Sequence, residues 1–172
     1  VLHISDTQSG LLLTMYAIGC VILYIPGGIL ADKMNPKKAL MLSLAVATIL
    51  TGAFAVTILL DLPGSVAYGI SLVIWLLIAF ASGFVFWTAI LKAIRIIGTE
   101  DEQGTMYGIY YAANGTTAAI IAAVNLWAYN AGGGDSNMKS GFFWAVVSMA
   151  AFTLLATILI AIFLEGKSDK DL

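Results

Sequence analysis

Charged side chains are scarce in this chain of 172 residues, and the first group of them places one carboxylate beside three amines: Asp32, Lys33, Lys37 and Lys38. A carboxylate near ammonium groups forms ion pairs, which strengthen where water is partly excluded. The group lies in a short turn between two long apolar runs. It is therefore either a stop between two helices or a contact that changes when those helices move.

A second charged segment, residues 92–103, brings Lys92 and Arg95 together with Glu100, Asp101 and Glu102. Neither segment has the residues of a catalytic or metal site. The chain has one cysteine and one histidine, no GxxxxGK phosphate loop and no GxSxG elbow. A carboxylate inside a membrane span is the usual sign of a proton relay, and the apolar runs contain none. We expect no enzyme activity, no metal, no cofactor and no nucleic-acid partner.

The composition indicates that the surroundings of this chain are apolar. Hydrophobic residues make up 60% of it and charged residues 10%, against about 25% charged in an average soluble domain. A helix needs about 20 apolar residues to cross a bilayer, and lipid admits only helices or closed barrels. Because the apolar runs do not alternate with polar residues, the sequence predicts an all-α, polytopic membrane helix bundle with the lipid bilayer as its partner.

Five long apolar runs predict five transmembrane helices in a single domain, residues 1–172. Their expected ranges are about 10–31, 38–60, 66–92, 104–129 and 141–164. Ser5 and Gln8 have the spacing of a capping box ahead of the first helix. Pro36 is suited to the first turn of the second helix. The chain starts with valine and is expected to be a fragment.

Lysine and arginine predict the orientation, because these residues concentrate in cytoplasmic loops. Three segments share one side of the membrane if all five helices span it: the hinges at 32–38 and 92–103 and the tail after residue 164. That side carries seven basic residues, and the opposite side carries only Lys139. We therefore expect a multi-pass protein of the cytoplasmic membrane with both hinges and the C-terminal tail in the cytoplasm.

The run 104–129 is the richest in polar groups. Tyr107, Tyr110, Tyr111 and Asn114 follow the i, i+3, i+4, i+7 spacing that places residues on one helix sector. Such a sector either lines a polar cavity for a solute or forms a belt of tyrosines at the membrane interface. The sequence leaves both alternatives open, with Asn114 the best candidate for a cavity residue.

The first hinge resembles a known family signature. Residues 28–37, Gly-Ile-Leu-Ala-Asp-Lys-Met-Asn-Pro-Lys, resemble the G-x-L-A-D-R/K-x-G-R/K-K loop of the major facilitator superfamily. The match includes Gly28, Leu30, Asp32, Lys33 and Lys37. It departs at Asn35, where the family has glycine, and at Pro36, where it has a basic residue. Asparagine is among the few residues that accept a left-handed backbone, so Asn35 is a tolerable substitute for the family's glycine.

The resemblance also covers the order of the helices. The five runs correspond to helices two to six of a six-helix half, and the preserved signature favours the amino-terminal half without its first helix. Residues 83–108 are similar to the region of helices four and five in transporters related to organophosphate and sugar-phosphate antiporters. The resemblance thus implies one half of a secondary carrier whose two halves rock around a central site.

In such carriers the signature aspartate helps to lock the cytoplasmic side in the outward-facing state. Carried over to this chain, Asp32 is the latch, and Arg95 from the second hinge is its expected partner. The resemblance implies transport of a small polar or anionic solute, with a co- or counter-transported ion and the remaining half of the carrier as partners. The alternative from another class is a small membrane scaffold or partner subunit that transports nothing. The coding sequence on either side of residues 1–172 discriminates between the two.

Overall fold

Six α-helices make up most of the protein in this computed structural model, which describes residues 1–97 and 99–164; the side chains of residues 31, 32, 84, 85, 96, 97 and 100 are outside the description. The helices are α1 (Asp6–Lys33), α2 (Pro36–Leu59), α3 (Gly64–Ala79), α4 (Trp87–Ile97), α5 (Gln103–Ala131) and α6 (Met138–Phe163). A π-helical segment, Phe80–Phe86, joins α3 to α4, and short 3₁₀ turns lie at Glu100–Glu102 and Gly134–Asn137. The described residues contain no strand, which confirms the predicted all-α class.

The first helix begins where the sequence places its cap. The Ser5 amide donates to Gln8 Oε1 at 2.9 Å and the Gln8 amide donates to Ser5 Oγ at 3.2 Å, so the predicted capping box is confirmed. With that cap in place the helix starts at Asp6, four residues ahead of the expected range. A carboxylate in the first turn also suits the positive end of the helix dipole.

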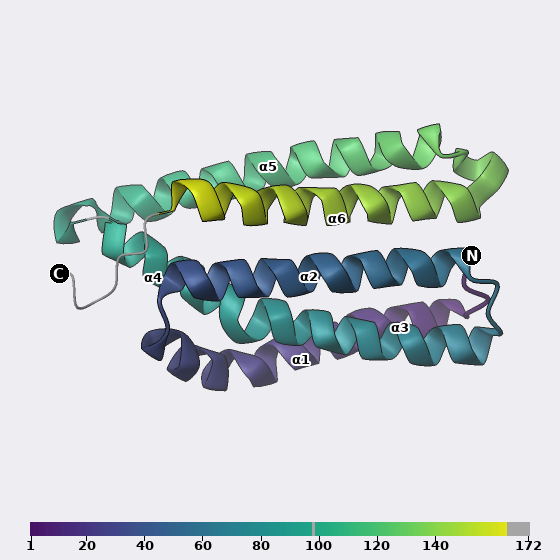
Figure 1. The fold of residues 1–172 in the computed structure, drawn as a ribbon, viewed down its shortest axis with the longest axis horizontal. Coiled ribbons are helices and arrows are strands. Elements are labelled where there is room, and N and C mark those ends of the chain that lie inside the picture. Colours follow the sequence, from purple (N-terminus) through teal and green to yellow (C-terminus); the bar gives the residue numbers. More distant parts are fainter. Residues whose placement is uncertain (98, 165–172) are drawn as a thin grey trace.

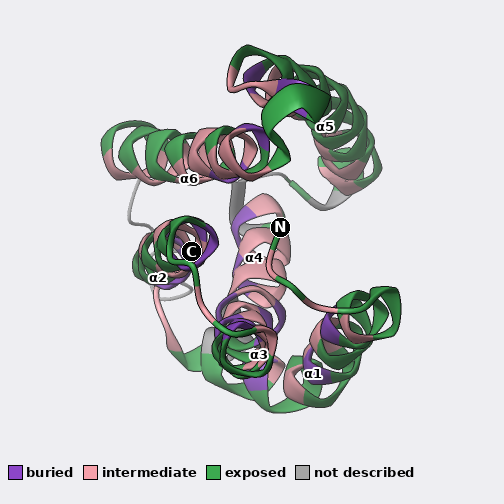
Figure 2. Ribbon diagram, turned by 90° about the vertical axis from the view of Figure 1, so that its right-hand side faces the viewer, coloured by how far each residue is buried: buried purple, intermediate pink, exposed green. Residues whose placement is uncertain are grey.

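The helices run roughly parallel to one long axis and pack side by side (Figure 1). The segment formed by α3, the π-helical residues and α4 contacts both α1 and α2, α2 contacts α6, and α6 contacts α5. Viewed along the axis, α5 therefore lies at the far side of the bundle from α1 (Figure 2). The segment from α3 through α4, called the third span below, lies between α1 and α2. The hinge that connects α1 to α2 therefore crosses one end of the third span.

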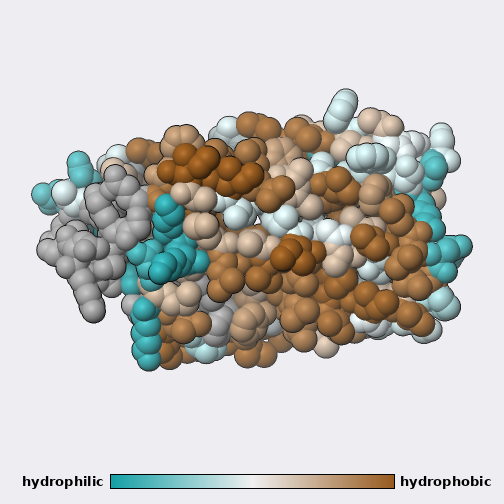
Figure 3. All heavy atoms as spheres, in the orientation of Figure 1, coloured by the Kyte–Doolittle hydropathy of each residue, from teal (hydrophilic) through white to brown (hydrophobic). Residues whose placement is uncertain are grey.

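Among the described residues, four stretches are long and apolar enough to cross a membrane: Asp6–Leu30, Pro36–Leu59, Gly64–Arg95 and Gly134–Phe163. Large apolar side chains stay exposed along them, and Figure 3 shows a wide hydrophobic belt between two polar ends. The fifth predicted span, α5, has 29 residues but is not among the four. Asparagine, threonine and glycine lower its hydropathy, and residues 111–120 are all exposed.

A close helix contact joins α1 to the π-helical segment. A Cβ placed on Gly83 would lie 2.7 Å from Cys20 Cα, which is closer than side chains allow, so only glycine permits this approach. Small residues at such crossings let the backbones of membrane helices pack tightly. Gly83 therefore sets how near the third span lies to α1.

Asp61, Lys139 and His3 tie together the end of the bundle that lies opposite the hinge. Lys139 Nζ lies 3.3 Å from Asp61 Oδ1, and His3 Nε2 lies 3.6 Å from the same oxygen. This links the start of the chain, the α2–α3 turn and the start of α6. The hydrogen bond and charge of Lys139, followed by those of His3, lower the pKa of Asp61 below the usual range of a carboxyl group.

The Asp61 pair gives a pH-dependent prediction. In Lys139→Met the pKa of Asp61 should rise toward that of an ordinary aspartate, because its main partner is lost. A depressed folded-state pKa stabilises the fold above the ordinary carboxyl pKa, and this contribution disappears as the pH falls through the folded value. A carboxyl NMR titration of labelled aspartate measures the change, with Lys38→Met at the other end as control. An unchanged Asp61 titration would contradict the assignment.

The Gly83 contact gives a second prediction. Gly83→Ala should lower the free energy of unfolding by about 1–3 kcal/mol, because the added methyl group overpacks the crossing with Cys20. Thermal unfolding in detergent measures the loss. The matched control is Gly52→Ala, whose new Cβ meets nothing within 4 Å and should leave the protein as stable or slightly more so. Equal unfolding temperatures for the two variants would refute this role of Gly83.

Candidate functional site

The hinge between α1 and α2 is held by a cap on α2. The Asn35 side-chain oxygen accepts from the Lys37 amide at 3.0 Å, and Pro36 occupies the first turn as predicted. The backbone of Asn35 is extended, with φ −66° and ψ 126°, so this position does not use the left-handed conformation that asparagine tolerates. Asparagine is selected here because its side chain caps the next helix, and an N-cap requires an extended backbone.

The third span closes on this hinge through α4. Lys92 Nζ lies 3.5 Å from the Met34 carbonyl oxygen, just beyond the end of α1. Beneath this contact Ala39, Leu40, Ala89 and Ala93 form a buried cluster, against which Met34 packs. The small alanines let α2 and α4 approach closely. The two charged segments that the sequence singled out therefore meet at one end of the bundle.

The predicted gating residues lie around that end. The nearest atom to a Cβ built on Gly28 is Thr88 Cγ2 of α4, at 3.8 Å. Lys33 and Arg95 are exposed, Lys37 is half-buried and Leu30 is 38% exposed. The side chain of Asp32 lies outside the described residues, so its expected pairing with Arg95 stays a prediction. Lys92 is the basic residue whose contact with the first hinge is described.

The polar sector predicted on α5 divides between two environments. Tyr107 points toward α4, where its hydroxyl group lies 3.5 Å from the Leu91 carbonyl oxygen. Tyr110 is half-buried with its ring against Tyr111, and Tyr111 and Asn114 are exposed. Both the solute cavity and the interfacial belt stay predictions for these four residues.

The π-helical segment was not predicted from the sequence. A π turn bonds residues five apart and commonly marks a functional position in a helix. Its loosened backbone is bonded by a neighbouring helix, because the buried Ser43 hydroxyl of α2 donates to the Ala81 carbonyl. Ser82 donates to the Ile78 carbonyl at 2.8 Å within its own span.

A small polar cluster joins the π-helical segment to α1. The Tyr16 hydroxyl lies 3.1 Å from Ser82 Oγ, and Cys20 Sγ lies 3.9 Å from the same oxygen. The one signal in the sequence is the Ser82–Gly83 pair in the middle of a long apolar run. Nothing in the spacing shows that Ser43 and Tyr16, from two other helices, meet that pair.

The chemistry of these groups is hydrogen bonding and charge contact. In the described part of the chain no three histidine, cysteine, aspartate or glutamate residues lie close enough to hold a metal ion. The hinge contact joins α4 to the end of α1, and the contacts of the π-helical segment join it to α1 and α2.

Among curated proteins, similarity extends over most of this chain. It is 27% identical over 128 residues to the inner membrane protein YqcE of Escherichia coli K12, covering 73% of this chain and 28% of that protein. It is 32% identical over 147 residues to the uncharacterized MG294 homolog of Mycoplasma pneumoniae, covering 78% of this chain and 30% of that protein. For the inner membrane protein YihN of E. coli K12 the identity is 24% over 162 residues, 91% of this chain and 36% of that protein.

The chain thus spans about a third of the length of these relatives. No solved structure matches it significantly. The family model of the Major Facilitator Superfamily matches residues 1–171. The hydrophobic belt and the names of the inner membrane relatives agree with a protein of the membrane. The chain belongs to the Major Facilitator Superfamily.

Proposed function

We propose that this chain is part of a secondary active transporter that moves a small polar or anionic solute across the cytoplasmic membrane by alternating access. Family membership supports transport in general. The observation that carries the mechanism is the meeting of the two charged segments, where Lys92 Nζ lies 3.5 Å from the Met34 carbonyl oxygen. A contact present in only one state biases an equilibrium between two states.

In this proposal the hinge end is cytoplasmic and closes when the carrier faces outward. Lys92 then holds the end of α1, and Asp32 is proposed as the latch carboxylate with Arg95 as its partner. The buried alanines of α2 and α4 give this closed state its tight packing. Opening toward the cytoplasm separates α4 from the hinge and exposes these charges to water, where each pair contributes little.

The π-helical segment is the hinge within the third span that allows this movement. It lies between the apolar α3 and α4, which bears Lys92 and Arg95. A wider turn with weaker hydrogen-bond geometry bends more easily than an α-helix. Ser43 keeps the Ala81 carbonyl bonded, so the segment can persist in lipid without an unpaired backbone group.

The solute class is proposed from the polar sector of α5. Tyr107, Tyr110, Tyr111 and Asn114 offer hydroxyl and amide groups, and basic side chains lie at the same end of the bundle. The exposed face of α5 at residues 111–120 leaves room for the remaining half of the carrier. The proposed partners are that half and a co- or counter-transported ion. The proposed subgroup is that of organophosphate and sugar-phosphate antiporters.

Transport by the full-length protein tests the function and the latch together. Liposomes that contain the protein are adsorbed to a solid-supported membrane, and the transport current is recorded. The panel of solutes is inorganic phosphate, a sugar phosphate, a dicarboxylate and an uncharged sugar. We expect at least one of these solutes to give a transport current. Asp32→Asn should reduce the initial rate about fivefold or more, because a partly shielded ion pair contributes roughly 1 kcal/mol. Asp135→Asn at the opposite end is the matched control. A normal rate for Asp32→Asn would rule out the latch.

Deleting one residue, Val85, tests the hinge within the third span. The deletion should return the π turn to α-helical register and stiffen the span. Distances between spin labels at Lys38 and Thr99, measured in the full-length protein with Cys20→Ser, should show two populations in the parent and one in the deletion variant. Thermal unfolding checks that the variant is folded. Two unchanged populations would show that the π-helical segment is not the hinge.

A further inference from the structure

A narrow apolar groove runs along α2 beside the π-helical segment. It has a volume of about 170 Å³ and is lined by Leu42, Ser43, Val46, Phe80 and Ala81. Leu42, Val46 and Phe80 are exposed and belong to stretches that can cross a membrane. The Ser43 hydroxyl already donates to the Ala81 carbonyl, so the groove offers an occupant no free hydrogen-bond donor. An apolar occupant suits this lining.

The groove lies on the side of α2 that the described helices leave uncovered. The side toward α6 is marked by Thr48, which bonds Thr153 at 2.9 Å. Leu42 and Val46 are 57% and 36% exposed on a different side. The volume of the groove is below the lower limit of about 300 Å³ for typical small-molecule sites. It suits one hydrocarbon chain better than a solute.

Lys38 stands at the hinge end of the same face of α2. Lys38, Leu42 and Val46 follow one another at intervals of four residues, which places them along one face of the helix. At 1.5 Å per residue, Val46 lies about 12 Å along the helix from Lys38. Half of the hydrocarbon core of a bilayer is about 15 Å thick. One lipid can therefore place its headgroup at Lys38 and an acyl chain beside Val46.

The start of α2 lacks a counter-charge. The helix begins at Pro36 and has no acidic residue in its first turn. Lys38 is exposed, and none of the described ion pairs includes it. The positive end of the helix dipole lies here too, where phosphate groups are favoured and cations are not. A side chain in the first turn leans toward the helix N-terminus, so Lys38 extends toward the headgroups. An anionic headgroup would supply the missing charge.

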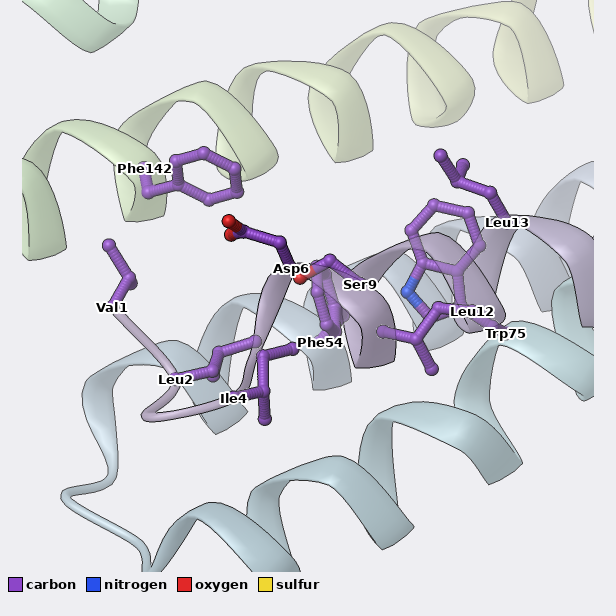
Figure 4. Close-up of a pocket in the computed structure, with 10 residues that line it drawn as sticks. All are labelled: Val1, Leu2, Ile4, Asp6, Ser9, Leu12, Leu13, Phe54, Trp75 and Phe142. Carbon is purple, nitrogen blue, oxygen red and sulfur yellow. The ribbon is translucent and has the colours of Figure 1, made fainter.

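The opposite end of the bundle offers no such charge to an anionic lipid. The hollow at that end is lined by Phe54, Phe142 and the Asp6 carboxylate (Figure 4). A carboxylate repels a headgroup of the same sign. Lys139, at the same end, is held by Asp61 at 3.3 Å. A lipid with a negative headgroup is therefore favoured at the hinge end.

We propose that the groove beside the π-helical segment binds one phospholipid with an anionic headgroup. Its phosphate lies at Lys38, and one acyl chain lies along Leu42, Val46 and Phe80. Anionic lipids attract lysines near the membrane surface, and the groove adds apolar contact that a smooth helix face lacks. None of these residues belongs to the proposed latch or solute cavity, so the site is independent of the proposed transport function.

Dioleoyl phosphatidylglycerol and dioleoyl phosphatidylcholine are suitable probes because they share the same chains and differ in headgroup charge. Native mass spectrometry of the full-length protein, purified in detergent, gives the dissociation constant for the first bound molecule of each lipid. Phosphatidylglycerol should bind about fivefold tighter, which is the effect of one lysine near a membrane surface. Equal dissociation constants would overturn the proposal.

Lys38→Gln tests the headgroup contact. It should weaken phosphatidylglycerol binding about fivefold and leave phosphatidylcholine binding unchanged, which also shows that the variant is folded. The matched control is Lys139→Gln, the same change at the opposite end, and it should bind both lipids as the parent does. A preference for phosphatidylglycerol that survives in Lys38→Gln, or that is lost equally in Lys139→Gln, would reject the site.

Val46→Phe tests the acyl-chain contact, because the larger side chain fills the groove. It should weaken phosphatidylglycerol binding about threefold or more, since the chain loses apolar contact. The matched control is Val56→Phe, the same change at a 53% exposed position of α2 that does not line the groove. Equal weakening by the two changes would contradict the assignment.

A photoreactive lipid locates the chain directly. Phosphatidylglycerol with a diazirine in the middle of one acyl chain should label residues 42–46 or Phe80 in the parent, and this labelling should be lost in Val46→Phe. If a helix from the remaining part of the carrier fills the groove in the full-length protein, these residues stay unlabelled. That result would overturn the proposal.

Discussion

Backbone hydrogen bonding in an apolar solvent is the constraint on which this structure depends. Lipid offers no partner to an N–H or C=O group, so unbonded backbone is tolerated only at the ends of spans or inside the bundle. The caps obey this rule. Ser5 with Gln8, Asn35 with Lys37, and Asn137 with the Ser140 amide bond the first turns of three helices.

The π-helical segment is the informative exception, because it interrupts a span instead of ending one. Its position coincides with three supports from other helices: Ser43 bonds the Ala81 carbonyl, Tyr16 bonds Ser82, and Cys20 packs on Gly83. These contacts hold the π turn in place between α1 and α2.

Polar side chains elsewhere in the helices join helix pairs. Thr48 of α2 donates to Thr153 of α6 at 2.9 Å, and Ser148 of α6 bonds Asn125 of α5 at 2.5 Å. Interhelical bonds of this kind contribute about 1 kcal/mol each in membranes. The first joins α2 to α6, and the second holds α5 to α6 near Asn125, whereas residues 111–120 of α5 are exposed.

The sequence predicted the features of the fold that depend on residues close together along the chain. Apolar runs gave the helical class, the Ser5–Gln8 spacing gave the cap, and Pro36 gave the start of α2. Asn35 shows the limit: its side chain can either accept a left-handed backbone or cap a helix, and the choice depends on where α2 begins. The π-helical segment is held by side chains of α1 and α2, and spacing along one helix carries no record of such contacts.

The contact at the hinge also bears on how strong a latch can be. Lys92 reaches a backbone carbonyl at the end of α1, and this end carries the negative partial charge of the helix dipole. That partner is present whatever side chain occupies position 32. A carboxylate there would add to an attraction that the backbone already provides. The closed state should therefore be weakened by neutralising Asp32 and still be populated, because Lys92 keeps its contact with the end of α1.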